Sequence, residues 1–393
     1  MTRPAIVSVV LTALMVGAIG AWYAVRQEAE FQRLITAGSA ALARDETYGA
    51  IEAFSGALAL KDDSMLAHLR RGDAYYRRGE LPTALRDLRQ AATLDPSAPA
   101  PTELSGDVNV AMGRYASAVE DYTAFTLLDD RSPRVHYKLG LAYYRNRQID
   151  EAIAPLRQAT TLDARLAEAH YLLGMCLREQ SKPDEALQAL TRVLEINPAF
   201  AAAREALVDL YDAAGRRREA LDQLEALAAL EPARPERLVS VGLAYASWGR
   251  TDAAVLTLGR AADRYSDEPL VHAALGRVWL DVAERRPDPV ALAKSLEALQ
   301  PLAASTSASA DTLTLYGRAL LLSGDARRAE VTLAEAARRL PVEPETFRYL
   351  AEAAERLGHR PMAREALRRY IALVGQDEVD AQIIDRLASV SDR

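Results

Sequence analysis

The sequence predicts an all-α solenoid of about ten helix-turn-helix repeats, and three observations support this fold class. A 34-residue pattern of small and apolar residues recurs along the 393-residue chain. Alanine holds one position of the pattern in nine repeats, and glycine holds another in eight repeats. A repeat of this length cannot bury its apolar face alone, so consecutive repeats must stack on one another. We therefore expect one elongated array instead of two or three globular domains.

The chain begins with an apolar segment that predicts a membrane anchor within residues 1–30. Residues 5–25 form an uncharged run of 21 residues, and a helix of that length spans roughly 30 Å, the thickness of a bilayer core. Trp22 and Tyr23 lie just before Arg26, as aromatic residues do at a membrane interface. The alternative is a cleaved signal peptide cut after Gly20, although the apolar region of such a peptide usually has roughly 7 to 15 residues.

Positive charges flank this segment almost equally. Arg3 and the amino terminus precede it, while Arg26 and Arg33 follow it. The flank with more positive charge usually stays on the cytoplasmic side. Because the two flanks are nearly equal here, they give only a small preference, and we expect the array on the extracytoplasmic side. We expect a single-pass protein of the inner (cytoplasmic) membrane.

The repeats follow the anchor without a linker and reach residue 377. Their expected ranges are 31–64, 65–98, 99–132, 133–166, 167–200, 201–234, 235–268, 269–309, 310–343 and 344–377. The eighth repeat is seven residues longer than the others, and we assign the extra length partly to residues 284–290 and partly to residues 303–310. This insertion is either a tolerated surface loop or a contact for a partner.

Two small residues predict how the helices of one repeat pack together. Position 8 is glycine in most repeats, as at Gly140, and position 20 is alanine, as at Ala152. No bulky side chain then separates the two helix backbones.

The tail at residues 378–393 predicts a capping helix. Val379, Ile383, Leu387 and Val390 share one face of this helix, which suits a cover for the apolar side of the last repeat.

The pattern is most complete in two successive repeats between Pro133 and Phe200. The first copy places its pattern residues at positions 4, 7, 8, 11, 20, 24 and 27, as His136, Leu139, Gly140, Tyr143, Ala152, Leu156 and Ala159. The spacing resembles the tetratricopeptide repeat (TPR). The resemblance implies a right-handed superhelix in which the first helix of each repeat lines a concave groove for a peptide or protein ligand.

In this family, positions 2, 5, 9, 12 and 13 usually face the bound peptide. Carried over to the fourth and fifth repeats, they predict partner-binding residues Arg134, Tyr137, Leu141, Tyr144, Arg145, Tyr171, Met175 and Arg178. An aromatic and apolar strip edged by arginines suits a peptide with some acidic character. The alternative is that the tyrosines pack between neighbouring helices. Members that bind chaperones hold a terminal carboxylate with lysine at position 5 and asparagine at position 9, and this chain has neither.

No motif in the sequence indicates catalysis. There is no Walker-type or dinucleotide glycine loop, no HExxH, no CxxC and no GxSxG motif, and a net charge of −7 gives no nucleic-acid footprint. The four histidines at position 4 are either packing rings or metal ligands, but none has a second ligand at a fixed spacing. They are His68, His136, His170 and His272. We expect no enzyme activity, cofactor, metal, nucleic acid or small-molecule substrate.

The layout, one membrane helix followed by the repeat array, is similar to that of the bacterial lipopolysaccharide assembly protein B family. Members of that family end in a rubredoxin-like metal module with paired CxxC motifs, and this chain has a single cysteine, Cys176. We predict a non-enzymatic, membrane-tethered scaffold that binds a peptide segment or protein subunit in bacterial envelope assembly. The alternative is a regulatory or accessory subunit of an envelope enzyme such as a glycosyltransferase or protease.

Overall fold

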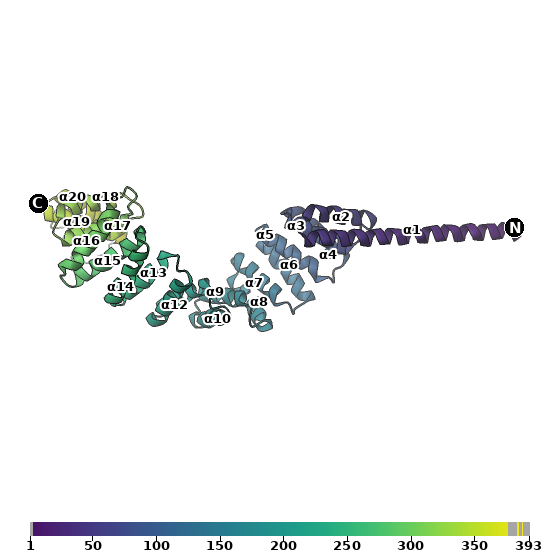
Figure 1. Cartoon of the computed structure of the whole chain (residues 1–393), viewed down its shortest axis with the longest axis horizontal. Helices are drawn as coiled ribbons and strands as arrows, with labels where there is room; N and C mark the ends of the chain where they lie inside the picture. The colour runs from purple at the N-terminus through teal and green to yellow at the C-terminus, as the bar shows by residue number, and fades with distance from the viewer. Residues whose placement is uncertain (1–2, 376–382, 385–386, 388–393) are drawn as a thin grey trace. The chain divides into compact units, whose positions relative to one another are not determined.

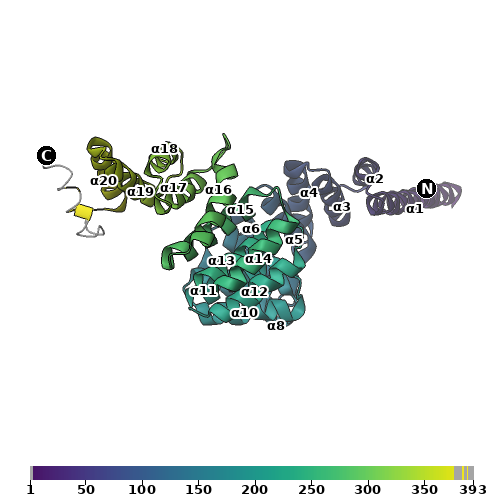
Figure 2. The ribbon, with the colours of Figure 1, turned by 60° about the vertical axis from the view of Figure 1, so that its left-hand side comes forward.

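The computed structural model describes the backbone of residues 3–375, 383–384 and 387, and side chains from residue 14 onward. This part of the chain forms twenty α-helices and no strand, so the predicted all-helical array of paired helices is confirmed (Figures 1 and 2). Within the same part, no helix has both the length and the apolar character needed to cross a membrane. The side chains of residues 5–13 in the predicted anchor, and most of the predicted capping helix at 378–393, lie outside the described residues.

Contacts within the chain divide it into an N-terminal half, Met1–Ala206, and a C-terminal half, Leu207–Arg393. The N-terminal half begins with α1 (Arg3–Ala43) and α2 (Thr47–Leu60). It continues with α3 (Met65–Arg77), α4 (Leu81–Leu94), α5 (Pro99–Ala111), α6 (Tyr115–Leu128), α7 (Pro133–Arg145), α8 (Ile149–Leu162), α9 (Ala167–Glu179) and α10 (Pro183–Ile196).

Helix α11 (Ala201–Ala213) includes the residues at which the two halves divide. The C-terminal half continues with α12 (Arg217–Leu230), α13 (Pro235–Ser247), α14 (Thr251–Arg264), α15 (Pro269–Arg285), α16 (Pro289–Ala303), α17 (Ala310–Leu322), α18 (Ala326–Ala336), α19 (Pro344–Leu357) and α20 (Arg360–Val374).

Helix α1 joins the apolar segment to the first repeat without a break. Side chains 14–26 are exposed, whereas α1 packs against α2 from residue 27 onward. Gln27 Nε2 donates to Leu60 O at 3.0 Å, and Glu28 pairs with Lys61. The Lys61 ammonium also lies 4.7 Å from the centre of the buried Phe31 ring. These contacts attach the start of the array directly to the helix that carries the apolar segment.

Within a repeat, the two helices meet where a glycine faces a large apolar side chain. A Cβ at Gly140 would lie 2.5 Å from Leu156 Cγ and 3.3 Å from the carbonyl oxygen of Ala152, which is fully buried. The same contact between positions 8 and 24 recurs at Gly38–Phe54, Gly72–Leu88, Gly106–Tyr122, Gly174–Leu190, Gly242–Leu258, Gly276–Leu299 and Gly317–Leu333. In these eight repeats, glycine is needed at position 8 because the large apolar side chain opposite fills the space that a Cβ would occupy.

The long eighth repeat differs from the prediction in where its extra residues lie. Gly276 meets Leu299, and the fully buried Ser295 takes the place of the position-20 alanine. Its hydroxyl donates to Gly276 O at 2.9 Å, which satisfies a polar group inside the helix pair. From Ser295 to the start of α17 the spacing is that of an ordinary repeat, so assigning part of the insertion to residues 303–310 was wrong. The extra residues lengthen α15 to 17 residues, against 13 in α13, and start α16 early, so that Ser295 is its seventh residue whereas Ala152 is the fourth residue of α8.

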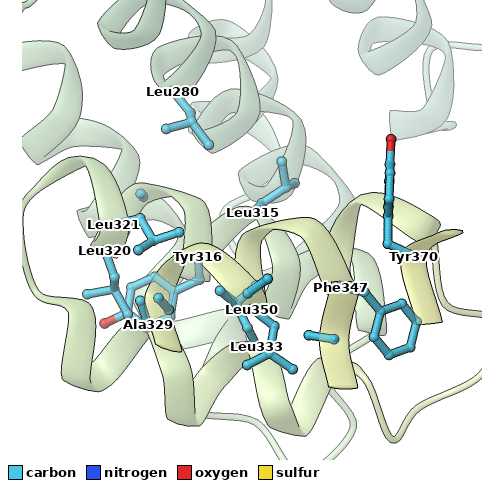
Figure 3. Close-up of a cluster of buried hydrophobic side chains, with 14 of the residues drawn as sticks. Leu280, Leu315, Tyr316, Leu320, Leu321, Ala329, Leu333, Phe347, Leu350 and Tyr370 are labelled. Atoms are coloured by element: carbon cyan, nitrogen blue, oxygen red, sulfur yellow. The ribbon is translucent and has the colours of Figure 1, made fainter. Parts of the chain in front are cut away.

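A cluster of buried apolar side chains forms the core between helices α15 to α20 of the C-terminal half (Figure 3). Leu333, Phe347 and Leu350 belong to this cluster, and so does Ile383 from the tail. Leu387 also packs against it. These two tail residues therefore contribute to the core beside α19 and α20.

Candidate binding surface

The predicted groove residues come from α7 and α9, the first helices of two successive repeats in the N-terminal half. Helix α7 begins at a fixed place because the Ser132 hydroxyl accepts a hydrogen bond from Val135 N at 3.3 Å and Pro133 occupies the first turn. The two helices contact each other. Regular helix starts therefore place equivalent positions of neighbouring repeats side by side.

The predicted residues differ in exposure along α7. Arg134 and Arg145 are exposed, while Tyr137, Leu141 and Tyr144 are half-buried. On α9, the three predicted residues Tyr171, Met175 and Arg178 are also half-buried. We call Tyr137, Tyr144 and Tyr171 the tyrosine strip.

Each member of the tyrosine strip has contacts within its own chain. Tyr144 donates from its hydroxyl to Glu179 Oε1 at 3.0 Å, and burial together with this carboxylate raises its pKa. The Tyr171 ring lies 5.1 Å from the Phe200 ring, and burial raises the pKa of Tyr137. The strip is therefore fixed in place by packing while part of each side chain stays accessible.

An acidic group that sequence reasoning missed lies on the preceding repeat. Lys138 Nζ lies 2.8 Å from Glu103 and 2.8 Å from Asp107, and the Tyr122 hydroxyl donates to Asp107 at 2.6 Å. Burial opposes the charge of Lys138, but its bonds to Asp107 and Glu103 raise its pKa. Positions 5 and 9 of the third repeat, Glu103 and Asp107, could have signalled this change of charge, because the same positions carry Tyr137 and Leu141 one repeat later.

The position-4 histidines bind the turn that precedes their own helix. His136 Nε2 lies 2.9 Å from Asp130 O, and His272 Nε2 lies 2.7 Å from Ser266 O. His68 and His170 make the same contact with the carbonyl six residues earlier. Each of these carbonyl oxygens can accept a hydrogen bond from the ring Nε2, which gives these residues a structural role. Among the described residues, no group of three or more histidine, cysteine and carboxylate side chains is placed to hold a metal ion.

Cys176 lies in α9 next to the predicted groove residue Met175, but its thiol is fully buried. Burial raises its pKa to about 12. The thiol is therefore protonated and is a packing group, since thiol reactivity requires the thiolate.

The two helices of a repeat pack closely at the glycine of position 8, and successive helix pairs stack on one another. This arrangement is that of a helical-repeat protein. Family models described as the tetratricopeptide repeat match residues 35–99, 104–167 and 137–202, and a further one matches residues 177–241. Together they cover more than half of the chain, which therefore belongs to the TPR family.

Several solved structures are similar to parts of the chain. MamA has 26% sequence identity and a TM-score of 0.40, with 41% of this chain and 95% of MamA covered. YrrB, described as a TPR protein with an unusual peptide-binding site, has 26% identity and a TM-score of 0.43, with 47% and 94% covered. A TPR protein from Parabacteroides merdae has 16% identity and a TM-score of 0.45, with 63% and 97% covered. No curated protein gives a significant match.

Proposed function

We propose that this chain is a non-enzymatic, membrane-tethered scaffold that binds a peptide segment or protein subunit at the predicted groove residues of α7 and α9. Its membership of the TPR family supports binding of a protein or peptide partner. The observation that carries the choice of site is the tyrosine strip, whose three rings are half-buried. Two of them, Tyr137 and Tyr144, lie on α7, which also carries the exposed Arg134 and Arg145. Aromatic side chains held by their own packing lose little entropy on binding, and arginines add attraction for acidic groups.

The proposed tether is the apolar segment at residues 5–25, in a single-pass protein of the inner membrane with an extracytoplasmic array. The segment is uncharged, and its described side chains are exposed along α1. An exposed apolar run of this length is costly in water and suits a bilayer. Together with the layout of the chain, this supports a role in bacterial envelope assembly.

The first test replaces the tyrosine strip with Tyr137→Ala, Tyr144→Ala and Tyr171→Ala in one variant. A peptide selected from a displayed library against the full chain serves as ligand, and its affinity is measured by calorimetry. We expect the triple variant to lose about 2 kcal/mol or more of binding free energy, because buried aromatic anchors carry that much at interfaces.

The control for this test is Tyr48→Ala, which removes a tyrosine that is 72% exposed on α2. Thermal melting of both variants separates the two interpretations of the strip. A folded triple variant that binds the peptide as tightly as the parent chain would contradict the site, and a large loss of stability with unchanged affinity would assign the tyrosines to the core.

The second candidate function is a regulatory or accessory subunit of an envelope enzyme, contacted partly through the membrane helix. The unbroken α1 favours it, because no linker separates the apolar segment from the first repeat. The test removes residues 1–26. This truncation keeps the contacts of Gln27 with Leu60 and of Glu28 with Lys61. A truncated chain that is helical by circular dichroism and keeps its partner affinity supports the scaffold. Loss of affinity despite correct folding supports the accessory subunit.

A further inference from the structure

A pocket of about 370 Å³ lies between α4 and the residue that precedes α6. Its lining is formed by Pro82, Leu85, Arg86, Arg89, Gln90, Thr93 and Arg114. Every lining residue belongs to the second helix of a repeat or to the turn before one, whereas the predicted groove lies on first helices. The pocket is therefore a different surface from the proposed peptide site.

Three arginines give this pocket an unusual charge for a chain with a net charge of −7. Arg86, Arg89 and Arg114 are all exposed, and none of them forms an ion pair with any residue that the structure describes. Other arginines of the chain do have carboxylate partners, as Arg71 has Asp87. No carboxylate lines the pocket.

The positive charge of Arg89 acts on the carboxylate of Asp121, which has a hydrogen-bond partner of its own. Asn109 Nδ2 donates to Asp121 Oδ2 at 2.6 Å. Burial raises the pKa of Asp121, and the positive charge of Arg89 opposes that effect only in part. Asp121 does not line the pocket, and all three charged side chains of the lining are arginines.

We propose that this pocket binds the phosphate group of a water-soluble ligand. Guanidinium groups match phosphate oxygens in a two-pronged geometry, and three positive charges complement a dianion better than a single carboxylate. Arg86, Arg89, Gln90 and Thr93 follow helical spacing on one face of α4, so their donors converge on the same volume.

The geometry also selects a soluble ligand over a lipid headgroup. Only Pro82 and Leu85 are apolar among the lining residues, and Leu85 is buried with 4% of its surface exposed. The pocket therefore has no apolar extension for acyl chains. Its volume suits a phosphate group together with a small part of the molecule that carries it.

The test is calorimetric titration of the full chain, in an uncharged detergent, with inorganic phosphate and with glycerol 3-phosphate. The main variant combines Arg86→Ala, Arg89→Ala and Arg114→Ala, and we expect its affinity to fall by about tenfold or more, since hydrogen bonds to charged groups are strong. A second variant with lysine at the three positions keeps the charge and loses the guanidinium geometry, so its affinity is expected to lie between those of the parent and the alanine variant.

The matched control combines Arg165→Ala, Arg217→Ala and Arg218→Ala, which remove three exposed arginines elsewhere and lower the net charge equally. We expect it to bind phosphate like the parent chain. Equal losses in the control and main variants, or no phosphate binding by the parent, would overturn the proposal. Tighter binding of a short-chain phosphatidic acid than of glycerol 3-phosphate, lost in the main variant, would overturn the assignment to a soluble ligand.

Discussion

At the scale of single residues, glycine sets how closely the helices of a repeat approach. The Gly140 site has no room for a side chain because Leu156 is fully buried against it and the Ala152 carbonyl lies behind. The strain of an added methyl group would therefore fall on the packed Leu156 side chain and on backbone.

Gly140→Ala is expected to lower the free energy of unfolding by about 1 to 3 kcal/mol, as overpacked cores do. The matched control is Gly259→Ala in α14, where an added Cβ meets no atom within 4 Å. There the reduced entropy of the unfolded chain and the better helix propensity should stabilise by about 0.5 to 1 kcal/mol. Urea unfolding of both variants measures the difference. If both substitutions change the free energy of unfolding in the same direction, the contact with Leu156 does not exclude a side chain at position 140.

The sequence could predict the helix interface at Gly140 and Ala152, but not every role of the residues around it. The regular recurrence of small residues identified this interface because close helix packing needs them in every repeat. The histidines at position 4 were expected to be packing rings, yet their rings also bind main-chain carbonyls six residues earlier. Every residue type carries such a carbonyl, so no sequence pattern indicates it. The partner role of the tyrosine strip stays a prediction.

At the scale of helices, a buried charged network connects α2, α3 and α4. Arg71 donates to both carboxylate oxygens of Asp87, from Nε at 2.6 Å and from Nη2 at 2.8 Å, and Nη1 donates to Ser55 Oγ at 3.2 Å. His68 Nδ1 also lies 3.1 Å from Asp87. No sequence pattern predicted this network, because an aspartate on an amphipathic helix is ordinarily solvated. Asp87 is only 4% exposed.

Asp87→Ala should lower the free energy of unfolding by about 2 to 3 kcal/mol, since it leaves the partly buried guanidinium of Arg71 without its carboxylate. The control is Glu195→Ala, which breaks the exposed pair of Arg192 and Glu195, with 43% and 56% of the side chains accessible. An exposed pair of this kind contributes only about 0 to 1 kcal/mol. Denaturant unfolding of the two variants checks the contrast, and a cost for Asp87→Ala no larger than the control would show that the network adds no stability.

The helix pairs were predictable from the period, but the location of the eighth repeat's insertion was not. Counting residues gives the total length of a repeat and leaves open where the surplus lies. The buried Ser295 shows where the extra residues lie, because it takes the alanine position and its hydroxyl bonds to α15, which sets the register of α16 against α15. Sequence reasoning sought an alanine there, and a serine that binds a helix carbonyl fills the same small space.

At the scale of the whole molecule, the division into two halves predicts how the chain unfolds. Repeats in a solenoid contact only their neighbours, so a loss of stability in one region need not spread to the other. The three tryptophans provide a local signal. Trp248 and Trp279 belong to the C-terminal half, and Trp22 lies on the exposed part of α1. Tryptophan fluorescence therefore reports on unfolding of the C-terminal half, while far-ultraviolet circular dichroism reports on all helices.

Two equivalent overpacking variants test this division, one in each half. Gly317→Ala places a Cβ 2.5 Å from Leu333 Cγ in the C-terminal half, as Gly140→Ala does against Leu156 in the N-terminal half. We expect Gly317→Ala to move the fluorescence transition in urea to a lower concentration. Gly140→Ala should leave that transition in place and lower only part of the circular dichroism transition, because a local cost of about 1 to 3 kcal/mol acts on the repeats that carry it. If either variant moves both signals together by the same amount, the chain unfolds as one cooperative body, and its two halves are not separate units of stability.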